Sequence, residues 1–155
     1  MKLDLKKLLI NLAIPLVGGV LIGLITGGMS GYKMLNQPPL SPPAWVFPVV
    51  WTILYLAMGY AVYRIQTSDG DAAAIRSASA AYYIQLALNF LWPILFFLLD
   101  AYLLAFVELL VLWIFVCITM WKFYKLDETA GDLLIPYLIW ITFAGYLNLG
   151  VYLLN

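Results

Sequence analysis

Three polar or aromatic side chains recur on one face of an apolar stretch of the sequence. Gln85, Asn89 and Trp92 follow one another at steps of four and three residues, which places them on the same face of a helix. An amide in apolar surroundings needs a hydrogen-bond partner, because a buried unpaired amide costs free energy. This face therefore either bonds to a neighbouring helix or lines a cavity in which Asn89 orients a ligand.

Two other apolar stretches carry a similar pattern. Trp140, Ala144 and Asn148 are spaced by four residues, and Trp51 and Tyr55 lie one helical turn apart. The small side chain of Ala144 leaves room beside a tryptophan ring. A buried indole N–H requires an acceptor, so these rings form either a packed core or the walls of an aromatic pocket. The spacing alone does not decide between the two.

The residue content argues against several other kinds of site. The sequence has no histidine, and its one cysteine is Cys117. The most common haem-iron and zinc ligand is therefore missing, and no intrachain disulfide can form. We also find no glycine-rich phosphate loop, no Ser-His-Asp set and no basic tract for nucleic acid. We expect no metal, no required cofactor and no nucleic-acid partner; a bound tetrapyrrole would be held by packing and hydrogen bonds.

The composition places these patterns in a membrane. Hydrophobic residues make up 65% of the chain and charged residues 10%, whereas a soluble domain is about half apolar and about a quarter charged. Apolar runs are 19 to 22 residues long, near the ~20 residues that cross a bilayer as a helix, and they cover residues 8–28, 45–63, 79–99, 101–121 and 133–154.

These runs predict an all-α integral membrane protein. They do not alternate as the strands of a membrane barrel would, and their short connections favour antiparallel neighbours in one five-helix bundle, a single domain of residues 1–155. The first run could instead be a secretory signal, although it is longer than the ~7–15 apolar residues of such a signal. We favour a retained helix.

The basic residues predict the orientation of the bundle. Lys33 is alone on one side of the expected membrane, and the other side holds Lys2, Lys6, Lys7, Arg64, Arg76, Lys122 and Lys125. Basic residues concentrate on the cytoplasmic side of membrane proteins. We therefore expect a cytoplasmic N-terminus and, after five crossings, an outer C-terminus.

One charge and two rows of small residues remain. Glu108 is the only charged residue well within an apolar run, so it is either a functional group or a neutral or headgroup-directed carboxyl. Small residues four apart let helices approach closely, and they occur as Gly19, Gly23 and Gly27 and as Ala73, Ser77 and Ala81. We expect the glycines to pack within the bundle, and the second row either to pack internally or to mediate a dimer.

Three long motifs resemble a known family. They are "PPAWVFPVVWTILYLAMGYA" (residues 42–61), "QLALNFLWPILFF" (85–97) and "LLIPYLIWITFAGYLN" (133–148). In this order they resemble the translocator protein family, also called the tryptophan-rich sensory protein, TspO/MBR or peripheral benzodiazepine receptor family. The resemblance runs from about Tyr32 to the end of the chain. It implies a five-helix bundle, commonly a homodimer, and here a member from a bacterial cell membrane.

The resemblance also implies a ligand and the residues that bind it. Family members bind porphyrins, notably protoporphyrin IX, and isoquinoline- or benzodiazepine-type compounds, in a cavity capped by the loop after the first helix. The matching positions are the paired pocket tryptophans Trp51 and Trp140, the wall residues Asn89, Trp92 and Ala144, and the loop residues Tyr32, Pro42 and Pro43. Tyr55 joins them because it shares a helix face with Trp51. The prolines would fix the angle at which the second helix starts.

Two classes of function are compatible with these residues. In the first, a receptor or transport-type protein binds an apolar ligand against Trp51 and Trp140, and Asn89 orients its polar atoms. In the alternative, an enzyme degrades protoporphyrin IX with light and oxygen, as the resemblance to bacterial members implies. No general acid or base is evident near the expected pocket, which favours binding, although the porphyrin itself could carry the photochemistry.

The loop departs from the family pattern at three positions. Gly31 and Leu40 stand where tryptophans are usual, and Gln37 replaces a lysine. The loss of two indoles and a cation weakens the expectation of tight binding for an anionic porphyrin at the mouth of the cavity. The end of the chain also lacks the basic residue of the cholesterol-recognition pattern, so we predict no specific cholesterol binding.

Overall fold

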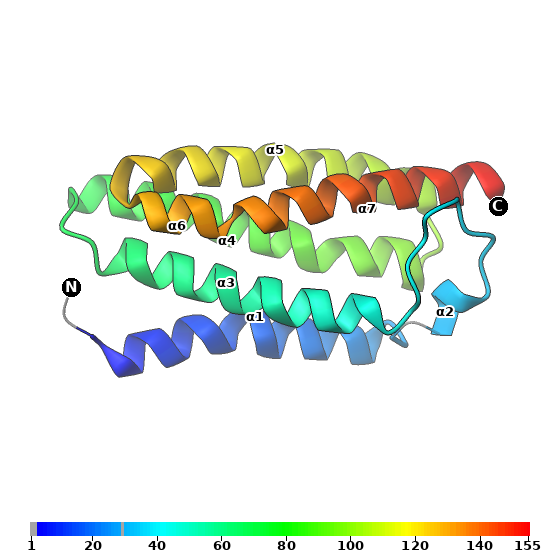
Figure 1. Cartoon of the computed structure of the whole chain (residues 1–155), viewed down its shortest axis with the longest axis horizontal. Helices are drawn as coiled ribbons and strands as arrows, with labels where there is room; N and C mark the ends of the chain where they lie inside the picture. Colours follow the sequence, from blue (N-terminus) through cyan, green and yellow to red (C-terminus); the bar gives the residue numbers. More distant parts are fainter. Residues whose placement is uncertain (1–2, 29) are drawn as a thin grey trace.

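The computed structural model describes residues 3–28 and 30–155, and these form a bundle of helices. Helices of membrane-spanning length and hydropathy are α1 (Leu5–Ile25), α3 (Val46–Gln66), α4 (Ala72–Pro93) with the π-helix η1 (Ile94–Leu98), α5 (Tyr102–Leu126), and α7 (Ile135–Leu154) preceded by α6 (Glu128–Leu133). A short helix, α2 (Ser30–Lys33), follows α1. The long helices run side by side, with the two chain ends at opposite ends of the bundle (Figure 1). The prediction of an all-α protein with five membrane-spanning helices is confirmed.

The helix boundaries differ from the predicted ones where local side chains decide them. α1 starts at Leu5 because the carboxylate of Asp4 accepts the backbone N–H of Lys7 at 3.1 Å, which caps the helix. It ends before Gly27 and Gly28, whose φ angles of 80° and 64° are left-handed and so favour glycine. The first span therefore lies earlier than the expected residues 8–28.

The later spans extend beyond their apolar runs. α4 begins at Ala72 rather than at residue 79, because Asp71 caps it by accepting the N–H of Ala74 at 3.2 Å, and α3 and α5 continue to Gln66 and Leu126. The last run is divided at Leu134, where Pro136 stands in the first turn of α7. Proline lacks the N–H that would continue the preceding helix. Apolar runs detect hydrocarbon-crossing segments, whereas helices extend further.

Glycines set the contact between α1 and the neighbouring helix α3. A methyl group on Gly59 would lie 2.5 Å from the carbonyl oxygen of Asn11, so the two backbones touch there. Gly19 packs on the ring of Tyr55, as expected for a glycine row within the bundle. The rest of that row behaves differently, because a methyl group on Gly23 would have nothing within 4 Å and Gly27 lies beyond the helix.

The loop between α1 and α3 fastens onto the far end of α7. It runs across the bundle to the C-terminal end of that helix and returns to the start of α3 (Figure 1). Tyr146 donates to the carbonyl oxygen of Pro39 at 2.6 Å, and the amide of Asn155 donates to the carbonyl oxygen of Asn36 at 2.9 Å. Gly150 leaves the space that the ring of Pro38 occupies. Together these contacts hold the loop over one end of the bundle. Met29, the first residue of the expected loop, lies outside the described residues.

Candidate functional site

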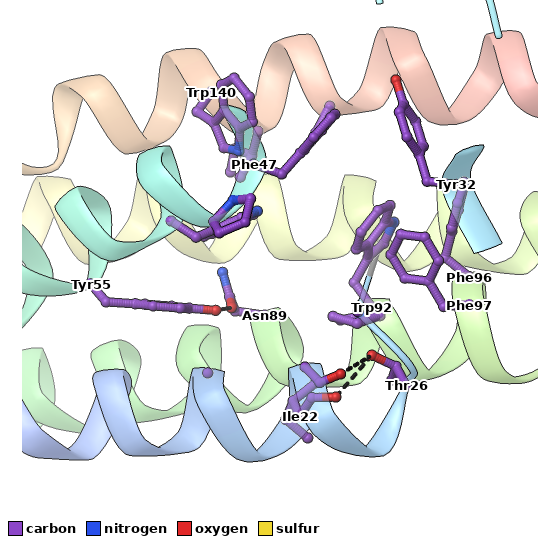
Figure 2. Close-up of a pocket in the computed structure, with 18 of the residues that line it drawn as sticks. Ile22, Thr26, Tyr32, Phe47, Tyr55, Asn89, Trp92, Phe96, Phe97 and Trp140 are labelled. Atoms are coloured by element: carbon purple, nitrogen blue, oxygen red, sulfur yellow. Dashed lines mark hydrogen bonds between the residues drawn. The ribbon is translucent and has the colours of Figure 1, made fainter. Parts of the chain in front are cut away.

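A cavity of about 380 Å³ lies inside the bundle, among α1, α3, α4, η1, α5 and α7. This volume falls within the range of ~300–1,000 Å³ that is usual for small-molecule sites. Its walls are mainly apolar, and they include the following predicted site residues: Tyr32, Trp51, Tyr55, Asn89, Trp92, Trp140 and Ala144. Figure 2 shows several of these side chains around the cavity. Residues far apart in the sequence therefore converge on one space.

Pro42 and Pro43 are not among the described residues that line the cavity. The carbonyl oxygen of Pro43 instead accepts the backbone N–H of Val46 at 3.1 Å, in the turn that leads into α3. Proline restricts its own φ and the conformation of the residue before it. These two residues therefore shape the approach to α3, while Phe47 and Pro48, just after them, reach the cavity.

A continuous series of aromatic rings forms one wall. Trp51 stacks on Tyr55 with ring centres 5.4 Å apart, and its ring meets that of Trp140 nearly at right angles, at 6.5 Å. Phe47 contacts Trp140 at 5.7 Å and Tyr32 at 4.9 Å. Offset and edge-to-face arrangements are the preferred geometries of aromatic pairs. The wall thus runs from α3 past α7 to the loop helix α2. In α2, burial raises the pKa of the Tyr32 hydroxyl above its ordinary value, and a hydrogen bond with the Ser41 hydroxyl partly offsets this rise.

A buried chain of hydrogen bonds starts at Tyr55 in this aromatic wall and runs away from the cavity. The hydroxyl of Tyr55 donates to Asn89 Oδ1 at 2.7 Å (Figure 2), and Asn89 Nδ2 donates to the hydroxyl of Tyr137 at 2.9 Å. The Tyr137 hydroxyl in turn donates to Gln85 Oε1 at 2.7 Å. Asn89 therefore makes the interhelical bonds expected of a buried amide and also lines the cavity. Its role in orienting a ligand stays a prediction.

The indole groups of Trp92 and Trp140 differ in their hydrogen bonds. Trp92 Nε1 donates to Asn148 Oδ1 at 2.9 Å, and Asn148 Nδ2 donates to the carbonyl oxygen of Tyr102 at 2.8 Å. Trp140 Nε1 is buried and has no hydrogen-bond partner among the described atoms. A buried donor without an acceptor costs roughly 1–3 kcal/mol. Trp140 therefore holds a donor that a ligand with a suitable acceptor would satisfy.

The wider turn of η1 brings two consecutive phenylalanines to the end of the cavity beside α2. Phe96 and Phe97 both line it, with ring centres 4.8 Å apart, and Phe96 stacks on Trp92 at 4.8 Å. The π-helix follows Pro93, within a single continuous membrane-spanning segment. Single π-helical turns are frequent at functional sites. The sequence analysis did not predict Phe96 and Phe97 as site residues, and Pro93 was the available signal.

Helix α1 supplies a wall that the sequence analysis also missed. Leu16, Gly19, Gly23 and Thr26 line the cavity from this side, and Thr26 donates to the carbonyl oxygen of Ile22 at 2.8 Å (Figure 2). The glycine row was the relevant signal. Because a side chain at Gly23 would meet open space, this glycine enlarges the cavity rather than admitting another helix.

Comparison with known proteins identifies the family. The sequence profile described as the TspO/MBR family matches residues 11–154. The chain belongs to the TspO/MBR family. It is 44% identical to the tryptophan-rich sensory protein of Cereibacter sphaeroides, over 80% of this chain and 76% of that one. It is 40% identical to the translocator protein homolog of Schizosaccharomyces pombe, over 92% and 88% of the two chains, and 37% identical to the translocator protein of Bos taurus, over 87% and 82%. The resemblance in the three motifs is thus confirmed, and the chain is an integral membrane protein.

Other candidate groups of this TspO/MBR protein lie away from the cavity. Glu108 is buried on α5, and neither carboxylate oxygen has a hydrogen-bond partner in the described part of the chain. It does not line the cavity. Within residues 3–28 and 30–155, no group of three or more histidine, cysteine, aspartate or glutamate side chains could hold a metal ion.

The second row of small residues in the TspO/MBR chain does not form one free surface. Ala81 is buried inside the bundle, while Ser77 accepts a hydrogen bond from Lys122 Nζ of α5 at 2.7 Å. Ala73 is exposed. Two of the three positions are therefore engaged within the protein.

Proposed function

We propose that this TspO/MBR protein is a receptor or transport-type membrane protein that binds protoporphyrin IX and isoquinoline- or benzodiazepine-like ligands in the cavity. The observation that carries the proposal is the convergence of Trp51, Trp140, Tyr55 and Asn89 on one mainly apolar space of about 380 Å³. Ligand sites are characteristically apolar spaces with a few placed polar groups. The porphyrin is a ligand in this proposal and not a cofactor that the protein requires.

The aromatic wall suits a flat ligand. Because the rings of Trp51 and Trp140 stand at 87° to each other, a planar molecule can stack on one ring while its edge meets the face of the other. The indole N–H of Trp140 has no partner among the described atoms, and a ligand acceptor beside it would relieve the cost of that buried donor. Asn89 and the Tyr55 hydroxyl supply a further polar contact, since both residues line the cavity.

The altered loop favours weak binding of the porphyrin carboxylates. A methyl group on Gly31 would lie 3.7 Å from the ring of Phe97, so a tryptophan at this position, usual in the family, would stand beside the end of the cavity that Phe97 lines. Gln37 donates to the carbonyl oxygen of Tyr32 at 3.0 Å and brings no positive charge. We therefore expect the ring system, rather than the carboxylates, to contribute most of the affinity.

Fluorescence quenching with matched tryptophan variants tests the proposal. The purified protein is titrated with protoporphyrin IX beside two double variants, Trp51→Phe/Trp140→Phe and Trp113→Phe/Trp121→Phe. The second pair does not line the cavity, and each variant keeps four of the six tryptophans, so their emission is comparable. We expect saturable quenching whose Kd rises at least tenfold in the cavity variant, about 1.4 kcal/mol, and stays within twofold of wild type in the control. Unsaturable quenching, or an equal effect in both variants, would disprove binding at this cavity.

We infer in addition that the N-terminus is cytoplasmic, that the membrane is a bacterial cell membrane and that the protein forms homodimers. The orientation is supported by basic residues at one end of the bundle, where the N-terminal end of α1 lies with the neighbouring ends of α3, α4 and α5. Lys2, also counted there, lies outside the described residues. Labelling single cysteines at Asp69 and Asn36 with an impermeant maleimide, in a Cys117→Ala background, tests it: only Asn36→Cys should react in intact cells. Light scattering of the detergent-solubilised protein tests the dimer, and a monomer mass would exclude it.

A further inference from the structure

The hydrogen-bonded chain Tyr55–Asn89–Tyr137–Gln85 has two ends in different surroundings. Tyr55 and Asn89 line the cavity, whereas Tyr137 and Gln85 are each 1% exposed and do not line it. Its members come from α3, α4 and α7, and its three bonds measure 2.7, 2.9 and 2.7 Å. Each bond is donated in the same sense, from the cavity towards Gln85. The hydrogen-bonding group that Tyr55 presents to a ligand is therefore connected to Gln85, which lies outside the cavity.

The same heavy atoms can hold this chain in the opposite sense. The oxygen and nitrogen of an amide side chain are nearly equal in size, and a hydroxyl can both donate and accept. If the two amides turn over, Gln85 Nε2 donates to the Tyr137 oxygen, Tyr137 donates to Asn89 Oδ1, and Asn89 Nδ2 donates to the Tyr55 oxygen. All three bonds are kept, and the hydroxyl hydrogen of Tyr55 becomes free to face the cavity.

Gln85, at the buried end of the hydrogen-bonded chain, has one unpaired polar atom in either direction. In the observed direction Gln85 Nε2 is buried without a hydrogen-bond partner among the described atoms. In the reversed direction Nε2 is used and Oε1 of the same residue loses its donor. An unsatisfied atom remains on Gln85 in both cases, so this end of the chain favours neither direction strongly, and the reversed direction is completed when a ligand accepts from the freed Tyr55 O–H. A ligand that bonds better to one direction can therefore shift the population towards it.

We propose that this chain is a reversible polar wall that lets one cavity accept either a hydrogen-bond donor or a hydrogen-bond acceptor from its ligand. In the observed direction Tyr55 presents an oxygen lone pair, and in the reversed direction it presents its O–H. Gln85 and Tyr137 are positioning residues that set this polarity through Asn89. Trp140, by contrast, offers a donor in both cases. The inference rests on the proposed function only in taking the cavity as the ligand site; the reversal itself is a property of the ligand-free protein.

Replacing Gln85 with methionine separates the two directions. Gln85→Met keeps a side chain of similar length but removes the atom that accepts from Tyr137. The Tyr137 hydroxyl then finds an acceptor only in Asn89 Oδ1, which is the reversed direction, and Tyr55 becomes a donor to the ligand. The probes are isoquinoline, whose ring nitrogen accepts, indole, whose N–H donates, and naphthalene, which does neither. Binding is measured by calorimetry in lipid nanodiscs, with the partitioning into empty nanodiscs subtracted.

The expected result is a change in selectivity. The affinity for isoquinoline divided by the affinity for indole should rise about three- to tenfold in Gln85→Met, as expected for one hydrogen bond gained or lost. Naphthalene, which neither donates nor accepts, gives the reference affinity. Thr119→Val is the matched control, because the buried Thr119 hydroxyl donates to the carbonyl oxygen of Phe115 within its own helix and lies off the cavity. Its ratio should equal that of wild type. An equal loss for all three probes in Gln85→Met would mean that Gln85 only packs, and would overturn the proposal.

A ligand-free measurement distinguishes failure of this inference from failure of the proposed function. In nuclear magnetic resonance spectra, Gln85→Met should shift the side-chain amide signals of Asn89, and the shift should vanish when Tyr137→Phe is already present, because Tyr137 transmits it. An unshifted signal, or one shifted equally in both backgrounds, would refute the reversal. If the coupling is present but no probe binds beyond empty nanodiscs, the proposed function fails and the reversal stands. Circular dichroism verifies folding, and Gln85→Leu replaces Gln85→Met if that variant does not fold.

Discussion

A larger side chain at Gly23 should lower the affinity for a ligand without lowering the stability of the protein. It belongs to the α1 wall of the cavity, and a side chain there would find nothing within 4 Å. A leucine adds four carbon atoms, on the order of 100 Å³ at the packing density of protein interiors. Gly23 lines a cavity of about 380 Å³ and a Cβ there meets no atom within 4 Å, so Gly23→Leu takes up part of the space that a ligand would use.

The two effects can be given magnitudes. Replacing a glycine inside a helix with leucine gains about 0.8 kcal/mol in helix propensity, so the melting temperature in detergent should not fall. A ligand that needs the filled space must displace the new side chain or shift, and overpacking of this kind costs about 1–3 kcal/mol. That corresponds to a Kd that is about 5- to 150-fold higher.

Quenching by protoporphyrin IX measures the affinity, and thermal unfolding followed by circular dichroism measures the stability. Gly23→Ala serves as a smaller step at the same position and should raise the Kd by less than Gly23→Leu. An unchanged Kd in Gly23→Leu would refute the assignment of α1 as a wall of the ligand site. A raised Kd accompanied by a lower melting temperature would refute the claim that the space beside Gly23 is open.

The remaining predictions concern packing, polarity and photochemistry. Gly59→Ala should be less stable to thermal unfolding than Gly145→Ala by roughly 1–3 kcal/mol, because a methyl group would lie 2.5 Å from backbone oxygen at the first position and 3.8 Å from the end of a leucine side chain at the second; equal melting temperatures would contradict the close contact of α1 with α3. Glu108→Leu should stabilise the protein by about 1–3 kcal/mol, since both carboxylate oxygens are buried without a partner in the described structure, and a lower melting temperature would reveal a partner in solution. Under illumination in air, bound protoporphyrin IX should bleach at the rate of the free compound; a new absorbing product that is lost in Trp51→Phe or Trp140→Phe would establish the enzymatic alternative instead.

Hydropathy predicted the spans but not where the helices end. The segment from Ala72 mixes alanines with the polar residues Arg76 and Ser77, which interrupt an apolar run but are compatible with a helix, so a search for apolar runs starts the helix late. The caps at Asp4 and Asp71 are local signals that hydropathy does not measure. Helix ends are decided by such hydrogen bonds, whereas the number and order of spans follow from the sustained apolar runs.

The same distinction applies to the cavity. Trp51 and Trp140 were identified through a family resemblance, and spacing placed Gln85 and Asn89 on one face. Tyr137 gave no such signal, because its hydrogen bonds to Asn89 and Gln85 depend on how α7 lies against α4. Phe97 was missed for a different reason: a constant helical period fails after Pro93, so faces assigned with that period are wrong beyond it.

The π-helix of residues 94–98 also has a consequence for the length of the chain. A π-helical turn accommodates one residue more than an α-helical turn over nearly the same rise. Removing one residue between Ile94 and Leu98 would therefore restore a regular α-helix, and the residues on either side would keep nearly the same orientation. Phe96 and Phe97 both line the cavity from this wider turn, so the deletion would change the cavity wall, while the turn at Asp100, with its φ of 51°, would still lead α5 to its place beside α4. A single-residue deletion here would therefore alter the cavity more than the packing of the bundle, whereas a deletion within a regular spanning helix would turn all that follows by about 100°.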